Sequence, residues 1–241
     1  MKIMKLLAEK AELRGEVPSP VIAFLGDSIT QGCFGVLLNQ DGNVDTEFDQ
    51  NSAYSSYIGK MLALLYPDAP VYILNADVSG DNSVNGNKRL ERDVLRFRPD
   101  LTVVCFGLND SCGGVSCVEE YTEALKSIFT RLKESGSEVI FMTPNMMNTY
   151  VSNCLKEPQL AEVAERTQMV QNDGILSSFL EAAKSTARDC GVSVCDVYSK
   201  WEKMQECGVD TTALLANLIN HPNRQMNWLF AYSLVETMIN D

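Results

Sequence analysis

The stretch Val21-Ile-Ala-Phe-Leu25 consists of five apolar residues in a row and runs directly into Gly26-Asp-Ser28. A short apolar run without polar alternation is typical of a strand that is covered on both faces, as strands of parallel sheets are. The glycine directly after the run permits a sharp turn. We therefore expect a buried strand over 21–25 whose carboxyl end brings polar residues to the edge of a sheet.

Similar apolar runs and helical patterns alternate along the rest of the chain. The further runs lie at 71–74, 101–106, 139–142 and 192–195. Apolar residues at helical spacing occur over 3–13, 53–66, 83–96, 118–134, 159–189 and 223–239. Short buried strands that alternate with amphipathic helices predict an α/β fold with a parallel sheet and helices on both faces. Five such strands favour a flavodoxin-like, doubly wound arrangement, in which ligands bind beyond the carboxyl ends of the strands.

The length of 241 residues suits one large domain, and no linker or repeat divides the chain. The first helical pattern ends at Gly15 and the Pro18-Ser-Pro20 break. Residues 1–19 are therefore predicted to be an N-terminal helical extension, and residues 20–241 a single domain.

Composition and charge exclude several classes of function. The chain is 45% apolar and carries a net charge of −12, which disfavours binding to nucleic acid or to anionic membranes. No apolar run is long enough for membrane insertion, and the start of the chain lacks a signal-peptide pattern. We expect a cytoplasmic protein whose eight cysteines are reduced and mostly buried. The sequence does not determine the oligomeric state, and it is compatible with a homo-oligomer.

Residues suited to a reactive site follow the first three expected strands. Ser28 comes after the first, Gly80 after the second and Asn109 after the third, while His221 precedes the last helix. Each of these features is weak alone, because a Gly-Asp-Ser triplet usually marks a turn and a lone histidine is usually structural. At the carboxyl ends of parallel strands, however, they would meet at one edge of the sheet.

In this order the blocks resemble those of the GDSL family, also called SGNH hydrolases. The matching residues are Gly26-Asp27-Ser28-Ile29-Thr30, Gly80, Gly107-x-Asn109-Asp110 and His221-Pro222. The resemblance covers about residues 20–240. It implies the SGNH hydrolase fold and hydrolysis of a small-molecule ester through an acyl-enzyme, with no cofactor and no metal.

The resemblance assigns a role to each block. Ser28 would attack the acyl carbon, and His221, the chain's one histidine, would take its proton and return it to the leaving alcohol. The oxyanion would be held by the backbone N–H groups of Ser28 and Gly80 and by the side-chain amide of Asn109. Asp27 and Asp110 are interpreted as structural residues that tie loops through backbone hydrogen bonds.

One position departs from the family pattern. The family usually carries an aspartate three residues before the histidine, and that position is Leu218 here. A backbone carbonyl near Leu218 or the side-chain oxygen of Asn217 would have to orient the imidazole, or else the base is poorly oriented. The first two arrangements predict a Ser-His dyad or a variant triad, and the third predicts a catalytically impaired ligand-binding module.

The substrate is less constrained than the reaction. We expect removal of a short acyl group, most simply acetyl, from a carbohydrate or another small polar alcohol. The supporting residues lie in a segment over 32–52 and include Asn39, Gln40, Asn43, Gln50 and Asn51. We interpret this segment as a solvated loop over the active site and not as a calcium site, because its acidic stretch lacks a glycine at the sixth loop position and has Ser52 at the twelfth, where calcium loops carry glutamate. The alternative is a lysophospholipase or thioesterase, for which Met146, Met147 and Tyr150 would form an apolar groove.

Overall fold

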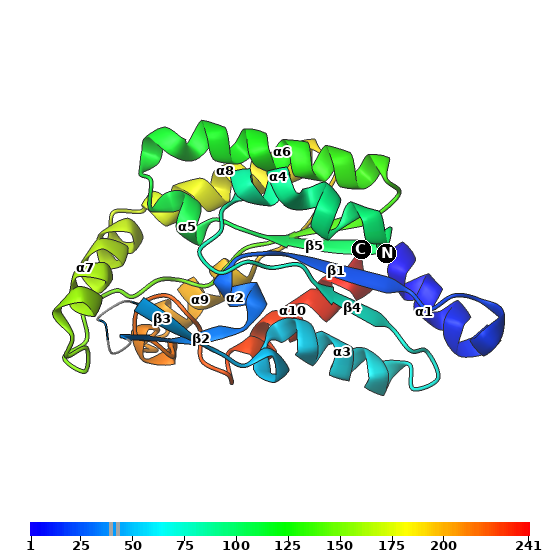
Figure 1. The fold of residues 1–241 in the computed structure, drawn as a ribbon, viewed down its shortest axis with the longest axis horizontal. Helices are drawn as coiled ribbons and strands as arrows, with labels where there is room; N and C mark the ends of the chain where they lie inside the picture. The colour runs from blue at the N-terminus through cyan, green and yellow to red at the C-terminus, as the bar shows by residue number, and fades with distance from the viewer. Residues whose placement is uncertain (39–40, 42–43) are drawn as a thin grey trace.

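The computed structural model describes residues 1–38, 41 and 44–241. Within these ranges five parallel strands form the main sheet, in the spatial order β4-β1-β5-β6-β7 (Figure 1). Their bounds are β1 Val21–Gly26, β4 Tyr72–Asn75, β5 Leu101–Cys105, β6 Glu138–Met142 and β7 Ser193–Cys195. In chain order this is the 2-1-3-4-5 arrangement of a flavodoxin-like sheet, so the expected fold class is confirmed. The edge strand β4 is only partly buried.

Helices cover both faces of the sheet (Figure 1). One face packs against α1 Lys2–Leu13, α3 Tyr54–Leu65, α9 Val197–Glu206 and α10 Asn227–Asn240. The other packs against α4 Ser83–Asp93, α6 Val118–Glu134 and α8 Ile175–Asp189. Along β1 the side chains alternate between the two cores: Ile22 and Phe24 join the first, and Ala23 and Leu25 join the second. Burial on both faces is the reason why the run at 21–25 is apolar throughout.

Three further helices and two further strands complete the described part of the chain. They are α2 Ser28–Gln31, α5 Leu108–Ser111, α7 Pro158–Asn172, β2 Cys33–Leu38 and β3 Val44–Phe48. Single 3-10 turns occupy Arg14–Glu16, Gln50–Ser52, Leu95–Phe97, Val115–Cys117 and Thr212–Leu214.

The structure of the segment after α2 differs from the sequence prediction. It is an antiparallel hairpin of β2 and β3, with Leu37 paired to Asp45, and not the solvated loop that was expected over 32–52. The alternation in Val44–Phe48 was the available signal for a strand. Asn39, Gln40 and Asn43, which were named as polar contacts, lie outside the described residues.

The continuous helix expected over 159–189 is also wrong. The chain forms α7 and α8, separated at Asp173 and Gly174. Gly174 has a φ of 72°, a left-handed conformation that ends α7 and that few other residues adopt at low cost. Helix α9, over Val197–Glu206, was not expected at all.

Helix α1 packs against the sheet and contributes Ile3 and Leu7 to the core. The backbone N–H groups of Lys2 and Ile3 both donate to the carboxylate of Glu138 at 2.7 Å, an anion at a helix N-terminus. These contacts place α1 beside the start of β6. A domain boundary near residue 20 stays a prediction.

Exposure of the cysteines differs from the expectation. All eight are free thiols, but only Cys33, Cys105 and Cys195 are buried, so the prediction of mostly buried cysteines is wrong. In the described part of the chain, no helix combines the length and the apolar character needed to cross a membrane.

Candidate active site

The turn after β1 sets Ser28 at the carboxyl edge of the sheet. A side chain at Gly26 would come within 2.7 Å of the Cys105 carbonyl oxygen of β5, so only glycine fits there. Asp27 then caps α2, because its Oδ1 accepts a hydrogen bond from the backbone N–H of Ile29 at 3.1 Å. Ser28 is therefore the first helical residue, directly beyond the strand.

The structure brings Ser28 and His221 together from positions 193 residues apart. The Ser28 Oγ lies 2.9 Å from His221 Nε2, and the two residues are 7% and 5% exposed. His221 stands in the loop before α10, where the N–H of Ala216 donates to its carbonyl oxygen at 2.7 Å and Leu215 pairs with Pro222. This separation is within the reach that direct proton transfer requires.

Asn217 occupies the other side of the imidazole. Its Oδ1 accepts hydrogen bonds from the backbone N–H groups of Ile219, Asn220 and His221 at 3.1, 2.9 and 3.0 Å. Its Nδ2 lies 3.2 Å from His221 Nδ1 and donates to Asn220 Oδ1 at 2.9 Å. The sequence left open whether a backbone carbonyl near Leu218 or the side-chain oxygen of Asn217 orients the imidazole. Asn217 does reach the ring, but through its nitrogen, so the second arrangement is wrong in the atom that makes the contact. Leu218, at a φ of 58°, forms the tip of this turn.

The surroundings of His221 favour the neutral imidazole. Burial lowers its pKa from the usual 6.5 to about 4. Among the described residues, the hydrogen-bond partners of its ring nitrogens are a hydroxyl and an amide. The ring is therefore neutral at pH 7, which is the charge state that a general base needs.

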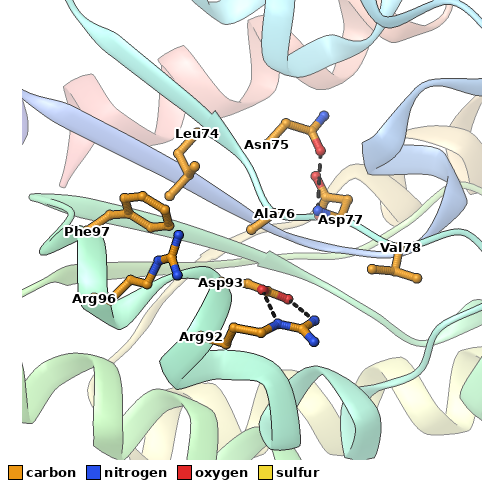
Figure 2. A pocket seen from close by; sticks show the side chains of 9 residues that line it. All are labelled: Leu74, Asn75, Ala76, Asp77, Val78, Arg92, Asp93, Arg96 and Phe97. Carbon is orange, nitrogen blue, oxygen red and sulfur yellow. Dashed lines mark hydrogen bonds and ion pairs between the residues drawn. The ribbon is translucent and has the colours of Figure 1, made fainter.

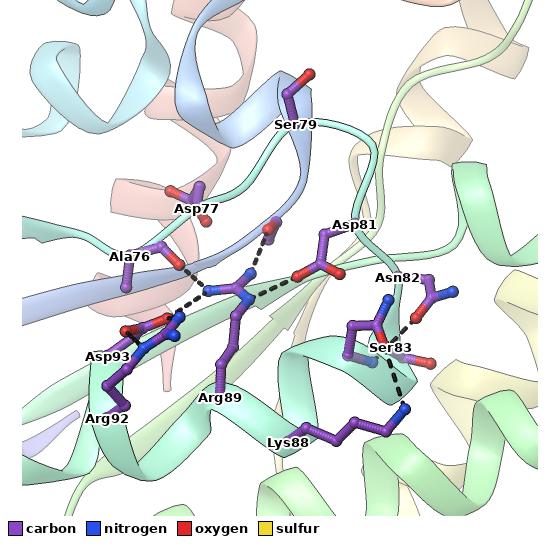
Figure 3. Close-up of polar contacts among 12 residues, drawn as sticks. Ala76, Asp77, Ser79, Asp81, Asn82, Ser83, Lys88, Arg89, Arg92 and Asp93 are labelled. Carbon is purple, nitrogen blue, oxygen red and sulfur yellow. Dashed lines mark hydrogen bonds and ion pairs between the residues drawn. The ribbon is translucent and has the colours of Figure 1, made fainter.

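Arg89 of α4 joins two loops at the same edge (Figure 3). Its guanidinium donates to the Gly26 carbonyl at 2.9 Å, to Asp81 Oδ2 at 2.5 Å and to the Ala76 carbonyl. The Arg89 side chain is 9% exposed and that of Asp81 6%, so this is a buried ion pair. It fixes the end of β1 relative to the loop that follows β4.

The loop that carries Gly80 is also tied to the loop after β5. Asn109 Nδ2 donates to the Asp81 carbonyl at 2.7 Å, and Asp110 Oδ1 accepts from the N–H and Oγ of Ser83 at 3.0 and 2.6 Å. Gly80 has a φ of 77° and open space where a side chain would lie. The residues predicted after the first three strands are thereby linked at one edge of the sheet.

Several carboxyl groups are buried beneath these loops. Burial raises the pKa of Asp27 to about 7, with smaller contributions from the charges of Asp110 and Asp81. Burial likewise raises the pKa of Asp110, and it raises that of Asp77 well above its ordinary value. The sequence analysis missed Arg89, Asp77 and Asp81, since nothing in the pattern of α4 distinguishes a buried arginine from its exposed neighbours.

A cavity of about 470 Å³ opens beside β4 (Figure 2). Its cations are Arg92, which is held by both carboxylate oxygens of Asp93 at 2.6 and 2.8 Å, and Arg96, which lies over the ring of Phe97. The Ser28–His221 pair does not line it. Within the described ranges there is also no cluster of three or more side chains suited to hold a metal ion.

Comparison with known proteins agrees with this geometry. Residues 24–229 match the model of the GDSL-like lipase/acylhydrolase family. An acetylxylan esterase of Geobacillus stearothermophilus is 26% identical over 141 residues, covering 51% of this chain and 58% of that protein. An arylesterase of Vibrio mimicus is 31% identical over 98 residues, covering 38% and 48%. The matched stretches thus span about half the length of these curated relatives.

Solved structures resemble the fold over nearly the whole chain. The structure of an acetylxylan esterase from Geobacillus stearothermophilus superposes with a TM-score of 0.66 at 18% identity, covering 91% of this chain and 94% of that one. An alpha/beta hydrolase from the metagenome of Lake Arreo gives 0.67 at 18% identity, covering 92% and 95%. At this level of identity the likeness establishes the fold.

Proposed function

Because the chain belongs to the GDSL-like lipase/acylhydrolase family, we propose that it is a serine ester hydrolase that works through an acyl-enzyme. The observation that carries the proposal is the 2.9 Å contact between Ser28 Oγ and His221 Nε2. Ser28 attacks the acyl carbon while His221 Nε2 takes its proton and passes it to the leaving alcohol. A water molecule then attacks the acyl-serine ester with the help of the same nitrogen, which releases the acid and restores both groups.

In this proposal the oxyanion is held by three donors. The backbone N–H groups of Ser28 and Gly80 supply two of them, and Asn109 Nδ2 supplies the third. An amide nitrogen has two hydrogens, and the Asp81 carbonyl takes one of them at 2.7 Å. That bond fixes the side chain so that its second hydrogen serves the substrate, and the open space beside Gly80 leaves room for an acyl group.

A short acyl group on a carbohydrate or another polar alcohol is the proposed substrate. Two observations support it: a relative bears the name acetylxylan esterase, and Met146 and Met147 are 3% and 1% exposed within the core. Those two methionines therefore do not line an open apolar groove of the kind that a lysophospholipase or thioesterase needs. We also propose a reducing compartment, the cytoplasm, because all eight cysteines are free.

Two measurements test the reaction. A burst of p-nitrophenol from p-nitrophenyl acetate, and labelling of Ser28 by a fluorophosphonate, are expected of the wild-type protein and not of the Ser28→Ala variant. Neither event is expected of a module that only binds ligand, so failure of both refutes the proposed function. Rates on p-nitrophenyl acetate, butyrate and octanoate then decide the acyl length, with acetate expected to be fastest.

A further inference from the structure

The side-chain amide of Asn217 has no hydrogen-bonding capacity left. Its oxygen accepts three backbone N–H bonds, from Ile219, Asn220 and His221. Its nitrogen has two hydrogens, of which one goes to Asn220 Oδ1 at 2.9 Å and the other points at His221 Nδ1 at 3.2 Å. The amide is 9% exposed, so solvent offers few alternative partners.

This network also fixes which end of the amide faces the imidazole. If the oxygen and nitrogen of Asn217 exchanged places, the NH₂ group would confront three backbone N–H donors, and three buried donors would lose their acceptor. The exchanged amide would gain at most one hydrogen bond, from His221 Nδ1–H, and would lose three from the backbone. The nitrogen of Asn217 therefore faces the ring.

We propose that Asn217 is a positioning residue that holds resting His221 in the tautomer protonated at Nε2, so that Ser28 Oγ accepts the hydrogen bond between them. An NH₂ group only donates, so Nδ1 must accept from it. A neutral imidazole has one acceptor and one donor, and the proton is consequently on Nε2. The same contact therefore sets the direction of the 2.9 Å bond to Ser28.

The consequence for turnover rests on the function proposed above. A base at Nε2 needs its lone pair free, which requires the other tautomer, with Nδ1–H directed at the N–H of Asn217. The imidazolium that forms during the reaction meets the same repulsion, and burial already lowers the pKa of His221. Only the fraction of molecules in which this contact is relaxed can react, so the observed rate is the unrestrained rate multiplied by that fraction.

Asn217→Asp should lift this restraint. One carboxylate oxygen keeps the three backbone N–H bonds, while the other accepts Nδ1–H and frees the lone pair of Nε2. Asn220 needs only to turn its amide to donate to the new carboxylate. Exchanging a buried aspartate for asparagine in a serine-histidine-aspartate triad costs about 10⁴ in turnover through the wrong tautomer. We expect the reverse exchange here to raise kcat by about 10- to 10³-fold.

The matched control is Asn220→Asp. It adds the same charge to the same turn, but next to the Asn217 amide instead of the ring, and it should raise kcat less than threefold. A gain for Asn217→Asp alone supports the proposal. Equal gains in both variants would mean that charge, and not the tautomer, limits the rate, and no gain in a folded Asn217→Asp variant would contradict the restraint.

The tautomer itself can be read without any turnover. Since the chain has one histidine, ¹⁵N-histidine labelling gives the signals of His221 alone. At pH 7 we expect Nε2 to show the shift of a protonated nitrogen and Nδ1 that of an unprotonated one, with the pattern reversed in Asn217→Asp. A protonated Nδ1 in the wild-type protein would overturn the proposal. If Ser28 is never acylated, the proposed function fails while this spectrum still decides the tautomer.

Discussion

The two halves of the candidate site are built from different chemistry. The half that carries Ser28 is held by a buried ion pair, in which Arg89 binds Asp81 and also donates to two backbone carbonyls (Figure 3). The carboxyl groups of Asp27 and Asp77 are buried in the same half. The half that carries His221 is held by neutral amides. The family pattern places a carboxylate beside the imidazole, where its charge would stabilise the protonated ring. Here that position is Leu218.

The neutral half is nonetheless well tied. Asn145 Nδ2 donates to the Asn220 carbonyl at 2.9 Å, and the N–H of Asn148 donates to the Ile219 carbonyl at 2.8 Å. These bonds attach the 217–221 turn to the segment after β6. The fold therefore positions both halves, but among the described residues only the half around Ser28 is held by a buried ion pair. Hydrogen bonds hold the imidazole in place, but in the part of the chain that the structure describes no charged group lies against its ring nitrogens.

The largest loss of activity should come from removing the imidazole of His221. We expect His221→Ala to lower kcat/KM for p-nitrophenyl acetate by about 10⁴- to 10⁶-fold, because no other group accepts the serine proton. Steady-state rates measure the loss, and circular dichroism and thermal unfolding serve as the control for folding. An unchanged deacylation rate in a folded variant would remove His221 from the mechanism.

Asn109 tests the oxyanion side. Replacing Asn109 by alanine should lower kcat by about 10²- to 10³-fold with a smaller change in KM, since the amide acts on charge that develops in the transition state. Asn109→Asp is the matched control: it keeps the shape, loses both N–H donors and places a negative charge near the oxyanion. It should be at least as slow. Equal activity of wild type and Asn109→Ala would show that the amide only ties the Asp81 loop.

Much of this arrangement follows from local sequence. The apolar runs predicted the strands to within one or two residues, since burial on both faces favours apolar side chains at 21–25 and at all of 101–105 except Thr102, whose hydroxyl is hydrogen-bonded to Ser137. The residues after those strands were found because parallel strands end at one edge, which brings Ser28 and Asn109 close in space.

What the sequence did not reveal depends on contacts between distant segments. Arg89 looks like any helical cation until Gly26, Ala76 and Asp81 surround it. The orientation of the Asn217 amide is likewise set by the backbone N–H groups of its own turn, which a side-chain pattern does not contain. The family pattern predicted the position of His221, but it did not predict that the neighbouring Asn217 would face the ring with its nitrogen.

Arg89 offers a test of the charged half by stability. Arg89→Met leaves Asp81 as a buried, unpaired carboxylate, and we expect it to cost about 3–5 kcal/mol in the free energy of unfolding. The control is Arg92→Met on the same helix. The Arg92 side chain is 70% exposed, so loss of its ion pair with Asp93 should cost far less than loss of the buried Arg89 pair. Urea unfolding measures both. Similar costs would mean that the buried network does not hold the loops.

The smallest expected effect concerns how stability depends on pH. Asp27 has a pKa of about 7 in the folded protein against an ordinary value of 3.8, so between these values the folded state retains a proton that the unfolded state has released. The contribution of Asp27 to the free energy of unfolding should therefore be complete below about pH 4. It should fall as the pH rises to about 7, by at most about 4 kcal/mol. Asn at this position keeps the bond to the N–H of Ile29 but does not ionise. Asp27→Asn should accordingly lose less stability between pH 5 and pH 8 than wild type, by urea unfolding.

Asp49 supplies the control for that measurement, because Arg224 lowers the pKa of its half-buried carboxylate. Its contribution is lost only as the pH falls toward that lowered value, so Asp49→Asn should leave the change between pH 5 and pH 8 as in wild type. The raised pKa values of Asp110 and Asp77 act in the same direction as that of Asp27 and persist in both variants, which is why the dependence should weaken and not disappear. Parallel pH dependences for wild type and Asp27→Asn would mean that the carboxyl beside Ser28 is ionised in the folded protein, and that the charged half of the site carries more negative charge than its burial indicates.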